Sequence, residues 1–400
     1  MPKRENKKEP REVDIHNRQK NHKRALEALE NSKICEENKE LILKFVRYKR
    51  LSTNISIARQ SKYYRYLRIL AELLKKPFDK ATTEDIEELL EKIYNRPVKR
   101  GETVKEASLW TKKDMTIILK AFYKWLKGCE NPKETAWIKL IKIENPVLGP
   151  DDLLSWEDVE KLSSVCMNVR DEALVKVLWE SGCRIGEILS LRIGNIEHRG
   201  KGVVIRLRQS KTKRRKILLV RSAGILIRYR NSHPHKEDKS YPLWINLQTH
   251  EQLNYAAAAH IIKRLAKRAK LDKPVNPHTF RKSSATYYAK YLSPSELKAR
   301  FGWKQSSKML DIYLHPDEEE VNKRILEIEG LEKMEKPKEK FKSCYSCGTL
   351  NSLKAENCCL CGEILDAEKS YLSKRLVWLV DELIKEKGGY DKALNELKVK

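Results

Sequence analysis

A short run rich in proline and glycine divides this 400-residue chain into two parts with different patterns. Residues 145–150 read Asn-Pro-Val-Leu-Gly-Pro, and such a run rarely continues a helix or a strand. Before it, apolar residues recur at helical spacing, whereas beyond it helical stretches are interrupted by strand-like alternation. Because a chain of this length also exceeds one typical domain, we expect separate domains that meet at residues 145–150.

Residues 31–146 have the periodicity of a small helical module. Four apolar residues of its clearest helix fall on one stripe: Tyr63, Leu67, Leu70 and Leu74. Four basic residues wind round the other side: Arg59, Lys62, Arg65 and Arg68. Such a run is often only a solvated surface, and it also suits a helix that contacts the DNA backbone. The preceding residues 1–30 are polar and without sustained periodicity, so we expect a basic N-terminal arm.

Residues 151–331 combine helices with one predicted hairpin. Alternating residues 202–208 and 216–220 flank a basic turn, which is typical of two antiparallel strands. Helical periodicity covers residues 255–270, 279–291 and 293–300. The predicted fold class is therefore mainly α with a small antiparallel sheet.

Five of the nine cysteines gather within residues 344–361. Four of them form two Cys-x-x-Cys pairs, each followed by glycine: Cys344, Cys347, Cys358 and Cys361. Four thiolates at this spacing can enclose a tetrahedral Zn²⁺, whereas the odd, clustered cysteines do not suit a disulfide framework. We expect a charged linker over residues 332–342, then a structural zinc ribbon and an amphipathic helix over residues 343–400. The leucine stripe of this helix fits an internal core or an assembly interface.

The charge of the chain indicates a polyanionic partner. Its 83 Lys and Arg residues outnumber 56 Asp and Glu residues, which gives a net charge of +27. A highly charged thermophile surface would balance its signs better, and nucleic acid is a more usual partner than acidic lipid. No apolar run reaches the ~18–20 residues that span a bilayer, and the N-terminus does not resemble a signal peptide. We expect a cytoplasmic, nucleoid-associated protein with no membrane contact.

Polar residues of the middle domain, each unremarkable alone, form an ordered set. They are Arg184 in Ser-Gly-Cys-Arg-Ile-Gly-Glu, Lys211 in Gln-Ser-Lys-Thr, His278 and Arg281 in Pro-His-Thr-Phe-Arg, Trp303 in Phe-Gly-Trp, and Tyr313 in Asp-Ile-Tyr-Leu-His. With this set, residues 153–322 resemble the tyrosine recombinase (phage integrase) family. The zinc ribbon adds a likeness to its archaeal, Xer-like members. The helical module then resembles the core-binding domain of the family, which closes a clamp around DNA.

The resemblance implies that Tyr313 is the nucleophile of a DNA-cleaving enzyme. A tyrosine hydroxyl can attack a phosphodiester and keep the bond energy in a phosphotyrosine ester. A free tyrosine has a pKa of ~10, so it needs positive surroundings to react at neutral pH. Arg184 and Arg281 would bind the non-bridging phosphate oxygens and stabilise the charge of the transition state. Glu187 would orient Arg184.

The same resemblance assigns roles to three further side chains. Lys211 would be the general acid toward the leaving 5′ oxygen, with Lys213 as a competitor for this role. His278 would assist proton transfer or bind the phosphate. Trp303 stands where most members have histidine, and it would donate its indole N–H to the phosphate. No catalytic metal or nucleotide is implied.

Other nucleophiles fit less well. Tyr287, Tyr288 and Tyr291 lie on the helix that carries Arg281, where aromatic residues are most often core. Tyr313 falls beyond a polar turn, on a separate short helix. Cys183, next to Arg184, is better explained as a small buried thiol.

The expected function is that of a site-specific recombinase or integrase acting on double-stranded DNA. The resemblance implies a homotetramer on paired sites, with two protomers at each site. One alternative is a type IB topoisomerase-like enzyme, which shares the chemistry but relaxes supercoils as a monomer. The other is a catalytically idle DNA-binding regulator, which the large positive charge would also suit.

Overall fold

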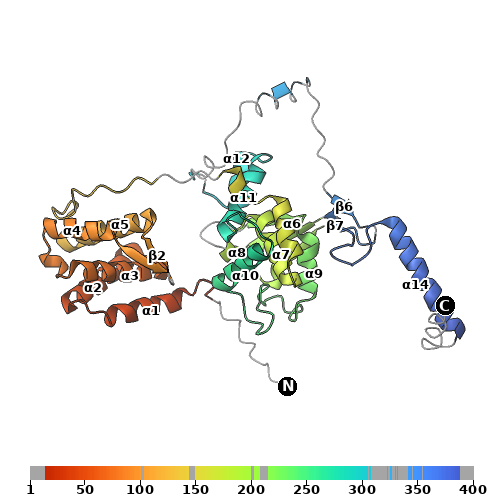
Figure 1. Ribbon diagram of the computed structural model, residues 1–400, viewed down its shortest axis with the longest axis horizontal. Coiled ribbons are helices and arrows are strands. Elements are labelled where there is room, and N and C mark those ends of the chain that lie inside the picture. Colours follow the sequence, from red (N-terminus) through yellow and green to blue (C-terminus); the bar gives the residue numbers. More distant parts are fainter. Residues whose placement is uncertain are drawn as a thin grey trace, which may run out of the picture. The chain divides into compact units, whose positions relative to one another are not determined.

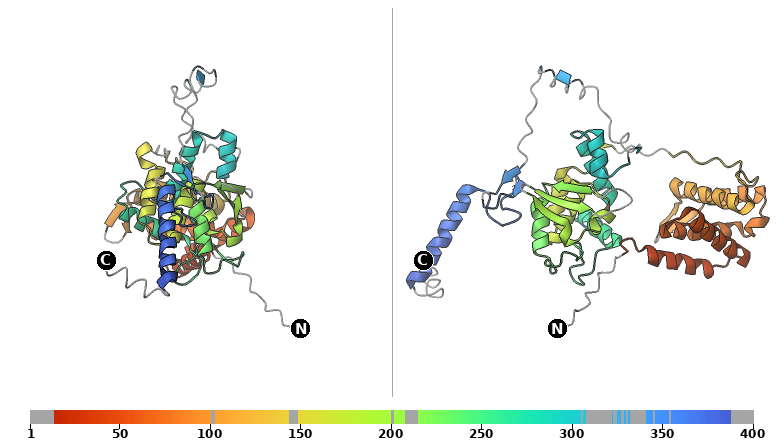
Figure 2. Two further views of the ribbon diagram at one scale, coloured as in Figure 1. Left: turned by 90° about the vertical axis from the view of Figure 1, so that its right-hand side faces the viewer. Right: turned by 180° about the vertical axis from the view of Figure 1, so that it is seen from behind.

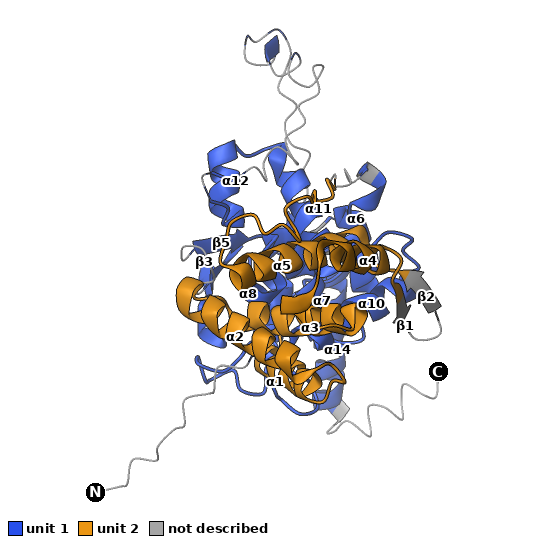
Figure 3. Cartoon of the chain, turned by 90° about the vertical axis from the view of Figure 1, so that its left-hand side faces the viewer, with its two compact units in different colours: residues 1–15, 147–400 blue, residues 16–146 orange. Residues whose placement is uncertain are grey.

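The computed structural model describes residues 14–100, 103–143, 149–199, 202–207, 215–304, 306–307, 322, 325–326, 329, 331, 341–344, 346–353 and 355–387. The chain divides into two compact units (Figure 3). One comprises residues 16–146, and the other comprises residues 147–400 together with 1–15. We refer to them as the helical unit and the second unit.

The helical unit contains five α-helices among its described residues (Figure 1). They are α1 (Arg18–Glu30), α2 (Glu36–Thr53), α3 (Ile57–Leu74), α4 (Thr83–Tyr94) and α5 (Leu109–Lys127). The predicted stripe of α3 is buried, with Leu67 and Leu70 fully inside the core. The capping box that starts α4 pairs the Thr82 side chain with the Asp85 backbone and the Asp85 carboxylate with the Thr82 backbone.

Two features of this unit differ from the sequence prediction. The basic arm was expected to extend to residue 30, but residues 18–30 form α1, which packs against α3 and buries Leu29. Ile15 accepts a hydrogen bond from the Tyr255 N–H at 2.8 Å, so the arm prediction is wrong for residues 14–30. A second difference is the antiparallel pair β1 (Pro97–Arg100) and β2 (Thr103–Glu106). Its strands are only four residues long and lack a clear apolar alternation.

The second unit is built around α7 (Val169–Ser181), whose residues are buried on every side. Helices and one sheet surround it (Figures 1 and 2). The helices are α6 (Trp156–Ser164), α8 (Ile185–Leu189), α9 (Ala223–Asn231), α10 (Tyr255–Arg268), α11 (Pro277–Ala289) and α12 (Pro294–Phe301). Short 3₁₀ turns cover Phe78–Lys80, Pro150–Asp152 and Ile193–Asn195 in the two units.

The predicted hairpin is present and belongs to a three-stranded antiparallel sheet. Its strands lie in the order β3 (Ile196–Arg199), β4 (Gly202–Leu207) and β5 (Arg215–Leu219). In the register of the hairpin, Ile205 is opposite Ile217 and Leu207 is opposite Arg215. The mainly helical fold class with small antiparallel sheets is thus confirmed, and strand β3 was not predicted.

The cysteine-rich segment forms a small two-stranded ribbon, β6 (Phe341–Ser343) and β7 (Leu350–Ser352), followed by the helix α14 (Ala367–Lys387). The ribbon is seated on α9, because Leu360 packs against the core and a Cβ at Gly224 would overlap the Cys359 sulfur. The Arg221 guanidinium also lies over the Phe341 ring, with its central carbon 5.7 Å from the ring centre. The sequence assigned no role to Cys359. In the structure its side chain packs against Gly224 of α9.

None of the helices in the described ranges combines the length and the apolar character needed to cross a bilayer.

Candidate active site and metal centre

A glycine turn places Arg184 at the start of α8. Gly182 ends α7 in the left-handed conformation (φ +57°), which favours glycine. A Cβ at this position would overlap the Phe301 ring, so the close approach of α12 also requires glycine. Cys183 follows, and Arg184 is the N-cap residue of α8. The Ser-Gly-Cys-Arg motif therefore joins the end of one helix to the start of the next.

Arg184, Glu187 and Arg215 share one carboxylate. Glu187 accepts hydrogen bonds from the Arg184 backbone N–H at 2.9 Å and from its Nη1 at 3.2 Å. Arg215 binds the same carboxylate through both terminal nitrogens, Nη1 to Oε1 at 3.1 Å and Nη2 to Oε2 at 2.7 Å. The Glu187 side chain is 3% exposed and that of Arg215 9%, whereas Arg184 remains 47% exposed. The predicted contact between Glu187 and Arg184 is confirmed.

Sequence reasoning missed Arg215, although a signal was present. In β5, Arg215 has the same parity as the buried residues Ile217 and Leu219, so its side chain starts on the inward face of the strand. A basic residue on an inward face needs a buried partner. That partner is Glu187.

Arg281 is fixed from two directions. It lies on α11 and is 7% exposed. Its Nη1 donates to the Gly182 carbonyl at 2.8 Å, and its Nη2 donates to the Phe301 carbonyl at 2.7 Å. Burial, reinforced by the positive charge of Arg184, lowers the pKa of Arg281 to about 10. The side chain is still protonated at neutral pH, and the two groups that accept its hydrogen bonds are neutral carbonyls.

His278 lies in the first turn of α11. Asn276 caps this helix by accepting from the backbone N–H groups of His278 and Thr279, at 2.9 Å and 3.1 Å. Part of the His278 side chain remains exposed. Partial burial, followed by the charges of Lys282, Arg281 and Arg184, lowers the pKa of His278. The imidazole is therefore neutral at neutral pH and has the two arginines as electrostatic neighbours.

Trp303 follows α12 after Gly302. Its ring stacks on Phe301 with ring centres 5.1 Å apart and the planes at 20°. The Arg281 guanidinium carbon lies 5.8 Å from the Trp303 ring centre. The structure thus brings Arg184, His278, Arg281 and Trp303 to one region of the second unit.

Three of the predicted residues lie outside the part of the chain that the structure describes: Lys211, Lys213 and Tyr313. Their roles stay predictions. The described strands β4 and β5 pair on either side of the segment that contains both lysines.

The other candidate nucleophiles have unsuitable surroundings. Burial raises the pKa of Tyr288 to about 12, and the Arg300 guanidinium lies over its ring at 4.1 Å. Tyr287 packs against Trp179 in the core, as expected. Tyr291 is 59% exposed, so its assignment to the core is wrong. Cys183 is 1% exposed and burial raises its pKa, which confirms a buried thiol.

The basic side of α3 is only partly available to an external anion. Lys62 pairs with Asp114 at 2.6 Å, and Arg68 pairs with Glu72. Arg59 and Arg65 lie over tyrosine rings, those of Tyr63 and Tyr66, at 5.0 Å and 4.9 Å. DNA contact by this helix stays a prediction.

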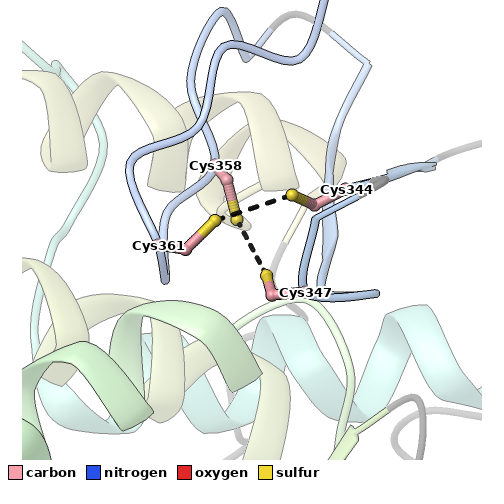
Figure 4. A group of neighbouring side chains, drawn as sticks. All are labelled: Cys344, Cys347, Cys358 and Cys361. Atoms are coloured by element: carbon pink, nitrogen blue, oxygen red, sulfur yellow. Dashed lines mark hydrogen bonds between the residues drawn. The ribbon is translucent and has the colours of Figure 1, made fainter.

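The four predicted thiols form one cluster (Figure 4). Their sulfur atoms all lie within 4.8 Å of one another, with Cys344 to Cys361 and Cys347 to Cys358 both at 3.6 Å. Sulfurs bound to one Zn²⁺ at ~2.3 Å in a tetrahedron would be ~3.8 Å apart. The donor set and its spacing therefore fit a zinc ion.

The two halves of the cluster repeat the same backbone turn. The Gly348 N–H donates to the Cys344 carbonyl at 2.8 Å, and the Gly362 N–H donates to the Cys358 carbonyl at 2.9 Å. Both glycines have positive φ, +70° and +78°. A turn that needs φ > 0 explains the glycine after each Cys-x-x-Cys pair.

Comparisons with known proteins agree with this geometry. A sequence profile described as the phage integrase family matches residues 153–320. The tyrosine recombinase XerD of Listeria monocytogenes is 29% identical over 158 residues, which are 37% of this chain and 53% of XerD. XerA of Saccharolobus solfataricus is 24% identical over 258 residues, 63% of this chain and 80% of XerA. The chain thus spans about half the length of this XerD.

Solved structures give the same fold. The Tn1549 transposon integrase in complex with circular intermediate DNA has a TM-score of 0.55 at 18% identity, covering 71% of this chain and 98% of the integrase chain. A lambda integrase dimer bound to a COC′ core site has a TM-score of 0.54 at 15% identity, covering 69% and 76%. The fold and the cluster of basic side chains together define an integrase-type catalytic domain. Residues 153–320 therefore carry a domain of the phage integrase family, and over this region the chain is similar to tyrosine recombinases.

Proposed function

We propose that this chain is a site-specific recombinase that cleaves and rejoins double-stranded DNA through a covalent 3′-phosphotyrosine intermediate. The observation that carries the proposal is the pair Arg184 and Arg281. Arg281 is held by two carbonyl oxygens, which leave its charge in place, and burial together with the charge of Arg184 lowers its pKa. A bound phosphate would compensate both guanidinium groups.

In the proposed reaction the phenolic oxygen of Tyr313 attacks the scissile phosphorus. The bond from phosphorus to the 5′ oxygen breaks, and a 3′-phosphotyrosine ester forms. Arg184 and Arg281 stabilise the charge that develops on the non-bridging oxygens. Rejoining is the reverse step, in which a 5′ hydroxyl displaces the tyrosine.

The remaining groups handle protons and orientation. Lys211 protonates the departing 5′ oxygen, with Lys213 as the other candidate for this step. His278, neutral at neutral pH because of its lowered pKa, takes the tyrosine proton or binds the phosphate. Trp303 donates its indole N–H to the phosphate. Glu187 and Arg215 are positioning residues, because the carboxylate held by Arg215 orients Arg184.

The proposal includes the assembly and the metal. Four protomers would act on two DNA sites, two at each site, in the cytoplasm on the nucleoid. The Tn1549 and lambda integrase structures, both with DNA, support DNA as the partner. Cys344, Cys347, Cys358 and Cys361 would hold a structural Zn²⁺, which cross-links the ribbon and takes no part in the reaction. The XerA relative supports the archaeal, Xer-like branch.

The test is a pool of nicked DNA duplexes with randomised sequence around the nick. Cleavage near the nick releases a short fragment, so rejoining fails and the covalent adduct accumulates. We expect a slow-migrating protein–DNA band in denaturing electrophoresis with the wild-type chain and none with Tyr313→Phe. Tyr288→Phe is the control and should retain the band. If Tyr313→Phe still forms the adduct, the proposed nucleophile is wrong.

The same experiment separates the alternatives. An idle regulator would bind the duplexes and form no adduct. A topoisomerase-like enzyme would form the adduct and relax a supercoiled plasmid without exchanging strands. A recombinase would invert or excise the segment between two copies of a site selected from the covalent adducts.

A further inference from the structure

The helix α14 presents an apolar face away from the ribbon that carries it. Two side chains on one side of α14 contact the ribbon: the Ser370 Oγ donates to Glu363 at 2.7 Å, and the Lys374 Nζ lies 3.1 Å from the same carboxylate. These two residues share one side of the helix, being four positions apart. Leu372 is two positions from each, and therefore about 200° round the helix at ~100° per residue.

The apolar side is a leucine stripe at heptad spacing. Leu372, Leu376, Leu379 and Leu383 follow each other at intervals of four, three and four residues. This is the d-a-d-a pattern of a coiled-coil seam. Leu372 is 52% exposed, Leu376 62% and Leu379 49%. The stripe is thus no internal core of the second unit, which was one of the two alternatives that the sequence left open.

We propose that α14 pairs, antiparallel, with α14 of a second copy of this chain. With two-fold symmetry, placing Leu376 against Leu379 of the partner also places Leu372 against Leu383, so the four leucines form four complete layers. The same register brings the two flanking charged positions together. Arg375 faces Glu382 of the partner subunit, and the symmetry repeats this contact.

The charges that flank the leucine stripe favour a second copy of α14 as the partner, in the antiparallel direction. Arg375 and Glu382 occupy the same heptad position, which meets its own kind across an antiparallel pair. Two opposite-charge contacts flank the seam in that arrangement, in each of which Glu382 is shared with Lys385 of its own helix, 3.6 Å away. In a parallel pair, Arg375 would instead face Val380, and its charge would gain no partner. Val380 is 42% exposed and adjoins the stripe, so pairing also covers part of it.

The pairing is weak and concentration-dependent in isolation, since stable coiled coils usually need at least ~3 heptads and α14 offers about two. Two chains held on one DNA site would meet at a much higher effective concentration. The contact goes beyond the proposed recombination and can be measured without DNA. Its failure would therefore leave the proposed chemistry untouched.

The first experiment is sedimentation velocity of the full-length protein without DNA, over about 1–100 μM, a range set by micromolar affinity. We expect a monomer–dimer equilibrium in the wild-type chain. Leu379→Lys should weaken it at least about 100-fold, because symmetry removes two leucine layers at once. Trp378→Lys is the matched control. Trp378 is 59% exposed and one residue away on another side of the helix, so the dimer should persist.

The second experiment tests the direction. Arg375→Glu and Glu382→Arg should each weaken self-association, because each sets like charges against one another. An equimolar mixture of the two variants should form the mixed dimer in excess over the statistical proportion, as counted by native mass spectrometry. A statistical mixture would overturn the antiparallel arrangement. A wild-type chain that stays monomeric, or a dimer indifferent to Leu379→Lys, would overturn the pairing itself.

Discussion

Arg215 and Glu187 form a two-pronged ion pair in the interior of the second unit, with contacts of 3.1 Å and 2.7 Å. Arg184 uses the same carboxylate, through its backbone and its side chain. Strand β5 is thereby tied to α8, the helix that Arg184 precedes. The half-exposed Arg184 is thus held by two side chains that are almost fully buried.

Arg215→Met should destabilise the second unit and slow adduct formation. Removing one partner of a buried ion pair leaves a buried charge, which typically costs about 3–5 kcal/mol. The measurement is chemical denaturation combined with single-turnover adduct formation. Glu187→Gln in the same chain should recover part of the loss, because the two residues are coupled.

The control for this pair is Arg206→Met. Arg206 pairs with Glu197 at the surface of the same sheet and is 52% exposed. Exposed pairs contribute about 1 kcal/mol or less. Equal effects of Arg206→Met and Arg215→Met would contradict the positioning role. Arg215→Lys should recover less than half of the cleavage rate, since an ammonium cannot make the two-pronged contact.

Arg184→Lys and Arg281→Lys should separate activity from stability. Both should lower the cleavage rate by about 10²–10³, the usual effect of losing a transition-state donor. Only Arg281→Lys should also lower the melting temperature, because Arg281 is buried and joins the Gly182 and Phe301 carbonyls. A clear loss of stability in Arg184→Lys would contradict the prediction that Arg184 is half exposed and faces the phosphate.

Gly182→Ala should lower the free energy of unfolding of the second unit. The change combines a left-handed backbone, at about 1–2 kcal/mol for a non-glycine residue, with an overlap against Phe301. Overpacking adds about 1–3 kcal/mol. Gly128→Ala is the matched control, since Gly128 has φ +66° and a new Cβ there meets no atom of the described residues within 4 Å. Equal losses of stability in Gly182→Ala and Gly128→Ala, measured by denaturation, would refute the contribution of the overlap with Phe301.

The four-cysteine cluster should hold one zinc ion per chain. Elemental analysis should find the metal in the wild-type protein and lose it in Cys358→Ser. Cys359→Ser is a strict control because it changes the adjacent thiol, whose sulfur faces Gly224 and not the cluster. Zinc retained by Cys358→Ser, or lost from Cys359→Ser, would mean that the ligands are assigned wrongly.

The pKa of His278 should lie below the ordinary value of about 6.5, and NMR titration can measure it. Lys282→Gln should raise it, since Lys282 is the strongest of the charges that lower it. Lys263→Gln, on α10, should leave it unchanged. Because the unfolded chain binds the proton more readily, the contribution of His278 to stability is complete above pH ~6.5 and is lost as the pH falls through the folded-state pKa. A titration at or above the ordinary value would contradict this.

Local patterns predicted the parts of the structure that depend on neighbouring residues. The hairpin followed from alternation, the start of α4 from Thr82 and Asp85, and the thiol cluster from the spacing of four cysteines. The contact between Glu187 and Arg184 was also within reach, since three residues separate them.

Features that depend on distant segments were missed. α1 is strongly polar, and its helix is stabilised by packing on α3, which no local pattern reveals. Arg215 lies 28 positions from Glu187, so only the folded sheet brings them together. The seat of the ribbon on α9 likewise depends on Gly224 and Cys359, which are far apart in the sequence.

That seat has a thermodynamic consequence. A metal that folds the ribbon also completes the surface on which α9 rests, through Leu360 and Cys359. Ligand binding to the native state alone stabilises everything that unfolds with it. Zinc supply should therefore influence how much of the second unit survives heat or proteolysis, including the region that carries Arg184 and Arg281.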